Sequence, residues 1–159
     1  RSRGRGTPLN RTRCNMLKLP HLAAIRWSRV STWAVIVYWA AMTLGTHLPG
    51  QSLPATPYSD KSLHLLAYTG FGFLVAWAWA ARRPFLWGGP LFAIAAAAGY
   101  GGLDEFTQTY IPGRYGDVVD WLYDAAGAVI GVALFLLVYA CTRSVLRAAR
   151  GQKLGVGGR

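Results

Sequence analysis

One stretch, VVDWLYDAAGAVIGVALFLLVYAC at residues 118–141, decides the fold class. It exceeds the roughly 20 mostly apolar residues that an α-helix needs to cross a bilayer. Three further apolar stretches lie at residues 30–48, 63–81 and 85–103, and turn-forming residues separate the four: Pro49-Gly50, Arg82-Arg83-Pro84 and Pro112-Gly113-Arg114. The sequence therefore predicts an all-α, polytopic membrane protein, a compact bundle of four transmembrane helices.

The third stretch has the weakest helical pattern, because glycine recurs along it. Gly99, Gly101 and Gly102 lie close to its expected end, and each lowers helical propensity. A kinked span is one alternative. A helix that begins near Pro90 and continues through Gln108 is the other.

Charge is distributed unevenly along the chain. The 159 residues are 53% hydrophobic and only 14% charged, with a formal net charge of +11; an average soluble domain has about 25% charged residues. Residues 1–29 and 142–159 contain basic but no acidic side chains, whereas residues 30–141 are slightly acidic. We predict a basic, disordered cytoplasmic tail over 1–29, a four-helix transmembrane domain over 30–141 and a second basic cytoplasmic tail over 142–159.

The distribution of Lys and Arg also predicts the orientation. The two tails and the turn at Arg82 and Arg83 hold most of the basic residues, while Lys61 and Arg114 lie on the opposite side. By the positive-inside rule, both termini are cytoplasmic in a multi-pass protein of the inner or plasma membrane. The basic tails are then topology determinants that contact anionic lipid, and no nucleic-acid partner is expected. Cys14 and Cys141 lie on the reducing side, which argues against a disulfide.

This topology places every acidic residue of the chain at the outer ends of the second, third and fourth spans. Ionisable groups inside a span are costly, so they face the bundle interior or a wet cavity. We therefore predict one outward-opening polar pocket, with Arg114 as its central cation. Its candidate residues are Asp60, Lys61, His64, Tyr68, Asp104, Glu105, Gln108, Arg114, Asp117, Asp120 and Asp124.

Structural roles compete with a binding role at several of these positions. Asp60 and Asp117 stand where helices begin and could serve as N-caps. Lys61 is more readily explained as a structural ion-pair partner, and His64 alone as a hydrogen-bonded packing residue. Asp120 continues a helical stripe with Asp117 and Asp124, and burying such carboxylates without partners would be expensive.

Three sequence blocks resemble the signatures of VanZ-like membrane proteins. These blocks are Asp60-Lys61-x-x-His64-x-x-Ala67-Tyr68, Asp104-Glu105-x-x-Gln108, and Pro112-Gly113-Arg114-x-x-Asp117-x-x-Asp120, followed by Gly127. Asp124 departs from the pattern, since the family often has Asn there. The resemblance implies a cell-envelope protein, and the family's namesake is associated with low-level resistance to the glycopeptide teicoplanin.

Three functions remain open at the level of sequence. The first is binding of a polar lipid or cell-wall precursor headgroup, with Arg114 and Lys61 contacting phosphate or carboxylate. In this hypothesis the acids either orient Arg114 and Lys61 or bind a divalent cation that bridges to phosphate. The second is an intramembrane enzyme that uses His64 or an acid as general base. The third is a purely structural membrane scaffold. No dinucleotide, Walker, GxSxG or HExxH motif is present, so no cofactor or metal is predicted, and the oligomeric state is undetermined.

Overall fold

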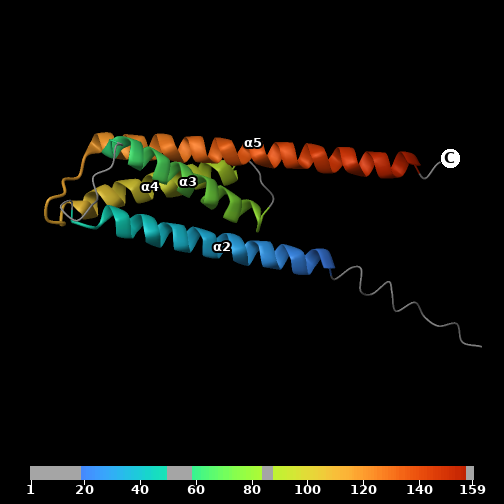
Figure 1. The fold of residues 1–159 in the computed structure, drawn as a ribbon, viewed down its shortest axis with the longest axis horizontal. Helices are drawn as coiled ribbons and strands as arrows, with labels where there is room; N and C mark the ends of the chain where they lie inside the picture. Colours follow the sequence, from blue (N-terminus) through green and yellow to red (C-terminus); the bar gives the residue numbers. More distant parts are fainter. Residues whose placement is uncertain (1–18, 50–58, 84–87, 157–159) are drawn as a thin grey trace, which may run out of the picture.

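The fold is an antiparallel bundle of four helices, seen in a computed structural model that describes residues 19–49, 59–83 and 88–156. The helices are α2 (Leu19–Thr46), α3 (Asp60–Ala80), α4 (Gly88–Gln108) and α5 (Val118–Val156), and the described residues contain no strand. Figure 1 shows the end of α2, the start of α3, the end of α4 and the start of α5 gathered at one end of the bundle. The expected all-α, four-helix fold is confirmed.

Helices α2 and α5 extend well beyond their predicted bounds. The prediction of disorder is wrong from Leu19 onward, because α2 begins there; Pro20 is tolerated in the first helical turn, where its missing N–H has no partner to lose. At the other end, α5 continues to Val156, since residues 142–150 contain neither glycine nor proline. The alternative boundary for the third span is correct, as α4 ends at Gln108. Residues 1–18 and 157–159 of the predicted tails lie outside the described residues.

Short polar side chains begin the two helices that carry most of the acids. Ser59 caps α3 by accepting a hydrogen bond from the Ser62 N–H at 3.2 Å, so the expected cap at Asp60 is wrong. Asp117 does act as a cap of α5, because its Oδ1 accepts from the Val119 N–H at 2.8 Å. Each cap satisfies a backbone donor that the helix itself leaves free.

Close packing between α3 and α5 forms the centre of the bundle. A Cβ added at Gly127 would lie 2.5 Å from the Leu65 carbonyl oxygen, and one added at Gly131 would overlap the Thr69 carbonyl. In the reverse direction, a Cβ at Gly72 would lie 2.7 Å from the Ala128 carbonyl oxygen. Small residues thus let the two backbones approach, as is usual for helices that associate in a membrane.

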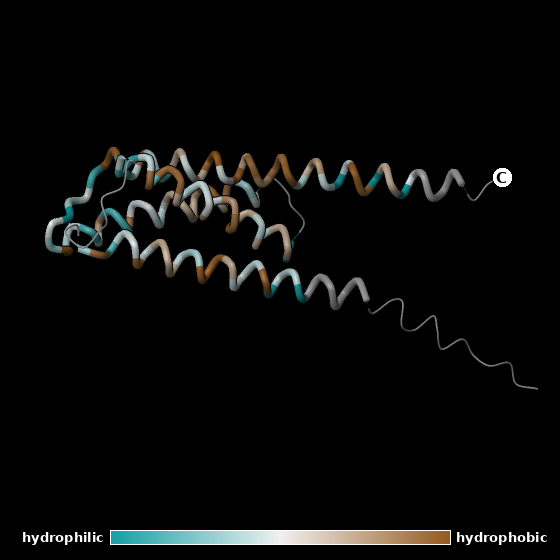
Figure 2. Tube along the Cα trace, in the orientation of Figure 1, coloured by the Kyte–Doolittle hydropathy of each residue, from teal (hydrophilic) through white to brown (hydrophobic). Residues whose placement is uncertain are grey.

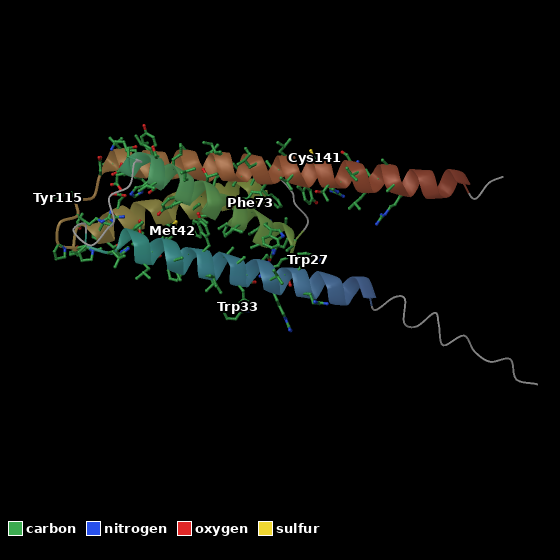
Figure 3. The ribbon with its side chains drawn as sticks, in the orientation of Figure 1. Trp27, Trp33, Met42, Phe73, Tyr115 and Cys141 are labelled. Carbon is green, nitrogen blue, oxygen red and sulfur yellow. The ribbon has the colours of Figure 1, made fainter. Side chains whose placement is uncertain are left out.

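Helix α2 is attached to one side of this centre. Over the described residues it packs against α3 and touches α4 but does not contact α5. The Tyr38 hydroxyl donates to the Ala67 carbonyl of α3 at 2.9 Å. Figure 3 shows Met42 directed into the bundle and Trp33 directed away from it, in line with exposed fractions of 9% and 65%.

Two of the four helices meet a length and apolarity test for membrane spans, α3 over Asp60–Ala80 and α5 over Val118–Gly151. Helices α2 and α4 are long enough, at 28 and 21 residues, but do not meet that test. Their sequences explain the difference, since α2 includes two arginines near its start and α4 ends in a polar, glycine-containing segment. Figure 2 shows the apolar residues concentrated along the middle of α5.

Candidate polar site at one end of the bundle

Helix direction alone brings the acidic residues together. Because α3 and α5 begin where α4 ends, acids from the first turns of α3 and α5 and the last turns of α4 share one end of the bundle (Figures 1 and 2). Several of these side chains are buried, among them His64, Asp104, Glu105, Gln108, Asp120 and Asp124. These six polar residues therefore lie inside the bundle rather than on its surface.

A buried triad of His64, Glu105 and Asp124 joins three helices. The His64 Nδ1 atom lies 2.9 Å from Asp124 Oδ1 and 3.6 Å from Glu105 Oε1. The side chains are 4%, 8% and 0% exposed, respectively. Gly101 makes room for the triad, because a Cβ there would lie 2.9 Å from Asp124 Oδ2.

Three buried polar atoms around this triad have no hydrogen-bond partner in the described part of the chain. They are Glu105 Oε1, Asp124 Oδ2 and the Tyr68 hydroxyl. Most buried polar groups in proteins are paired, so such exceptions require an explanation. Two unpaired carboxylate oxygens within the triad, together with the unpaired Tyr68 hydroxyl, indicate that the protein atoms alone do not satisfy this site.

Lys61 forms ion pairs with both acids at the start of α5. Its Nζ lies 3.0 Å from Asp120 Oδ1 and 3.4 Å from Asp117 Oδ2. The Val119 N–H, with a smaller effect from Lys61, holds the pKa of the Asp117 carboxyl below its usual range. The Asp117 N–H in turn donates to Glu105 Oε2 at 2.8 Å, which connects this group to the buried triad.

Asp104 belongs to a separate polar group that faces α2. Gln108 Nε2 donates to Asp104 Oδ2 at 2.9 Å, as the one-turn spacing predicts. The Thr46 hydroxyl donates to Asp104 Oδ1 at 3.0 Å, and His47 Nδ1 lies 3.5 Å from the same oxygen. Asp104 and Glu105 are adjacent in sequence, but they point to different neighbours because consecutive helical side chains are about 100° apart.

Arg114, the predicted central cation, lies away from the carboxylates. The Arg114 Nε donates to the Leu48 carbonyl oxygen at 3.3 Å, and its Nη2 donates to the Gly45 carbonyl oxygen at 3.4 Å. The guanidinium pairs with no carboxylate among the described residues. The loop after α4, which turns at Gly113 with φ +78°, carries the arginine across the end of α2 instead of between α3 and α5. Lys61 takes the place among the carboxylates that was expected for Arg114.

A cavity of about 400 Å³ opens between α2 and α3 beside these groups. Arg114, Asp60, His64 and Thr46 form its polar lining, and aliphatic and aromatic side chains form the rest, namely Tyr38, Ala41, Met42, Leu63, Ala67 and Tyr68, with Gly45. The candidate residues thus divide into the cavity lining, the Lys61 group, the buried triad and the Asp104 pair.

Sequence reasoning missed the contribution of α2. Thr46 and His47 bind the Asp104 group, Thr43 bonds the Tyr100 hydroxyl at 2.6 Å, and Tyr38 lines the cavity. A signal was present, because Thr43, Thr46 and His47 follow i, i+3, i+4 spacing where α2 ends, directly after the apolar run at residues 33–42. Such a polar stripe at the end of a span marks a face directed into the bundle.

Taken together, the fold and the site define a class of protein. Large apolar side chains such as Trp33, Leu91 and Leu137 are more than 60% exposed, whereas acids and a histidine are buried. This distribution is the one expected when the surroundings are hydrocarbon, so the protein is an integral membrane protein of the helical bundle class.

The chain belongs to the VanZ/LLP1 family, whose profile matches residues 7–139. The match covers all three sequence blocks that carried the resemblance and reaches from before α2 into α5. Neither curated proteins nor solved structures show a significant match to the chain.

Proposed function

We propose that this protein binds the anionic headgroup of a membrane lipid or a lipid-linked cell-wall precursor in the cavity between α2 and α3. One observation carries the proposal: the cavity combines an apolar lining with Arg114 at its polar side, and that arginine has only carbonyl partners among the described residues. A guanidinium offers a forked set of donors that suits phosphate or carboxylate. The apolar lining suits the first carbons of the attached lipid chain.

The proposal includes an orientation. Both termini lie in the cytoplasm, and the polar end of the bundle faces outward, toward the periplasm or the cell exterior. The basic residues support this arrangement, because they are concentrated at the chain ends and at the turn after α3. An outward-facing headgroup site is where a protein could alter susceptibility to a glycopeptide such as teicoplanin.

Binding is tested on the purified full-length protein in detergent, by native mass spectrometry with three probes. The probes are farnesyl pyrophosphate, phosphatidylglycerol and inorganic pyrophosphate. We expect a lipid-linked probe to bind and Arg114→Ala to weaken that binding at least about 10-fold, as for loss of a hydrogen bond to a charged group. Arg143→Ala, an exposed arginine in the far part of α5, is the matched control and should bind like the wild type.

The outcomes separate the possible ligands. Preference for farnesyl pyrophosphate indicates a pyrophosphate-linked precursor, and preference for phosphatidylglycerol indicates a bilayer lipid. Equal losses in Arg114→Ala and Arg143→Ala, or no lipid binding by the wild type, would contradict the proposal. Release of inorganic phosphate from a bound probe would instead indicate an enzyme.

A cell assay connects binding to phenotype. Wild type, Arg114→Ala and Arg143→Ala are expressed in the same glycopeptide-susceptible host and compared for teicoplanin susceptibility at equal membrane abundance. We expect the wild type and the control to shift susceptibility and Arg114→Ala to lose that effect.

A further inference from the structure

We propose that His64, Glu105 and Asp124 form a binding site for one divalent metal ion of the zinc or manganese class. The ion would lie inside the bundle and join α3, α4 and α5. The inference goes beyond headgroup binding, because it concerns the buried triad and not the cavity lining around Arg114.

The distances within the triad fit a coordination shell. One ligand atom from each of the three residues lies within 4.8 Å of the other two, and the His64 Nδ1 atom is 2.9 and 3.6 Å from its two oxygen neighbours. Bonds of about 2.1 Å in tetrahedral or octahedral geometry place neighbouring ligand atoms about 3.0–3.5 Å apart. Small side-chain movements would therefore bring all three ligand atoms within bonding distance of one ion.

Unsatisfied atoms give a second, independent reason. The Glu105 side chain is 8% exposed, and its Oε1 lies beside His64 without a hydrogen bond within the described residues. Asp124 is 0% exposed and has an equally orphaned Oδ2. A complete hydrogen-bond network would leave neither oxygen without a partner. A bound cation would be coordinated by both of them.

The local charge also favours a cation. Asp120 already has Lys61 at 3.0 Å, but among the described residues the His64 imidazole is the only basic side chain paired with Glu105 and Asp124. When both carboxyl groups are ionised, the two carboxylates and one imidazole carry a net negative charge whether or not the histidine is protonated. Buried charges are retained when they are paired or coordinate a metal.

Outer contacts would hold the ligands in place and provide a path to them. The Asp117 N–H binds Glu105 Oε2 at 2.8 Å, which fixes the direction of that carboxylate. His64 also groups with Asp60 and Asp120, with ligand atoms within 4.8 Å of one another. Asp60 and His64 line the cavity, so an ion could pass from the cavity through this group to the triad.

The ligand chemistry selects the class of metal. Calcium and magnesium prefer all-oxygen sites, whereas one imidazole nitrogen with carboxylate oxygens suits zinc or manganese. The absence of thiolate from the triad argues against a copper(I) or iron–sulfur site.

The experiment measures metal directly and needs no lipid, so its failure is distinct from failure of headgroup binding. Full-length, tag-free protein in detergent is stripped with EDTA, incubated with ZnCl2 or MnCl2, desalted and analysed by elemental mass spectrometry. We expect about one ion per chain and a higher thermal midpoint for the loaded protein. Loading with Co²⁺ should give visible absorption bands characteristic of nitrogen and oxygen ligands.

Near-isosteric variants locate the ion. Glu105→Gln and Asp124→Asn should each lower metal affinity at least about 10-fold. Asp104→Asn is the matched control, a buried carboxylate one residue from Glu105 whose partners are Gln108 and Thr46, and it should bind like the wild type.

Two results would overturn the inference. Absence of saturable binding to the wild type would leave a histidine–carboxylate hydrogen bond as the whole role of the triad. Equal affinity in the wild type and both triad variants would place the ion elsewhere. The wild-type stoichiometry and Co²⁺ spectrum decide the question even if a variant fails to fold.

Discussion

A single lysine compensates two carboxylates at the start of α5. Lys61 lies 3.0 Å from Asp120, whose side chain is 10% exposed, and 3.4 Å from Asp117, which is 45% exposed. Ion pairs at an exposed position contribute little, but removal of one partner of a buried pair leaves an uncompensated charge. The bond to Asp120 is therefore the one that matters for stability.

A double-mutant cycle tests whether the ion pair between Lys61 and Asp120 contributes to stability. Lys61→Met should lower the thermal midpoint of the detergent-solubilised protein, because Asp120 loses its cation. Adding Asp120→Asn should recover part of that loss, since the stranded charge is removed as well. Thermal unfolding of the two single variants and the double variant gives the coupling between Lys61 and Asp120. Strictly additive changes in thermal midpoint would contradict a stabilising ion pair.

The pH dependence of Asp117 has a defined sign. Its pKa is lowered in the folded protein, first by the Val119 N–H and then by Lys61, so folding favours its ionised form. The stabilisation is complete above the unfolded pKa, about 3.9, and is lost as the pH falls through the lower folded value. The difference in thermal midpoint between wild type and Asp117→Asn should be constant from pH 7 to about 5 and disappear in stronger acid. A difference in thermal midpoint that grows on acidification would contradict this prediction, because it would mean that folding favours the protonated form of Asp117.

At the scale of elements, the contact between α3 and α5 sets the geometry of the site. His64 on α3 and Asp124 on α5 meet at 2.9 Å, one turn of α5 before Gly127 packs against the Leu65 carbonyl. Because the backbones approach so closely there, short side chains can bond directly between the helices. The small residues at this contact thus also position the polar residues.

Glycine substitutions in α5 test this dependence. Gly127→Ala and Gly131→Ala place a methyl group against the backbone of α3, and we expect each to destabilise the fold by about 1–3 kcal/mol, the usual cost of overpacking. Gly151→Ala, with nothing within 4 Å of its added Cβ in the same helix, is the control. Folded yield and thermal midpoint in detergent give the readout, and equal stability of all three variants would contradict the packing argument.

At the scale of the molecule, α2 begins and α5 ends at the end of the bundle opposite the acids (Figure 1). The long extensions of α2 and α5 carry basic residues away from the polar site. Charge is thereby separated along the bundle axis, with acids at one end and, within the part of the chain that the structure describes, most of the basic residues at the other.

Reporter fusions test the proposed orientation. A reporter fused after Arg159 should be active only if it works in the cytoplasm, and one inserted near Pro54 only if it works outside. The positive-inside rule is the physical basis of this expectation. The opposite pattern, or labelling of single cysteines at positions 82 and 114 on the same side, would contradict the topology.

Sequence by itself determined the four helices, their order and the end at which the acids gather. Apolar length predicts each span, and the alternating direction of successive spans fixes which loops share a side. It also predicted local pairs such as Asp104 with Gln108, because one helical turn fixes that spacing.

Only the tertiary structure decided which charges meet. The side-chain hydrogen bonds of Lys61, His64 and Arg114 join residues that lie 56 to 69 positions apart along the chain. Those pairings depend on helix rotation and on the path of the loop after α4, and neither is encoded in local spacing. Arg114 therefore bonds the end of α2, whereas His64 meets Asp124 where glycines bring α3 and α5 close together.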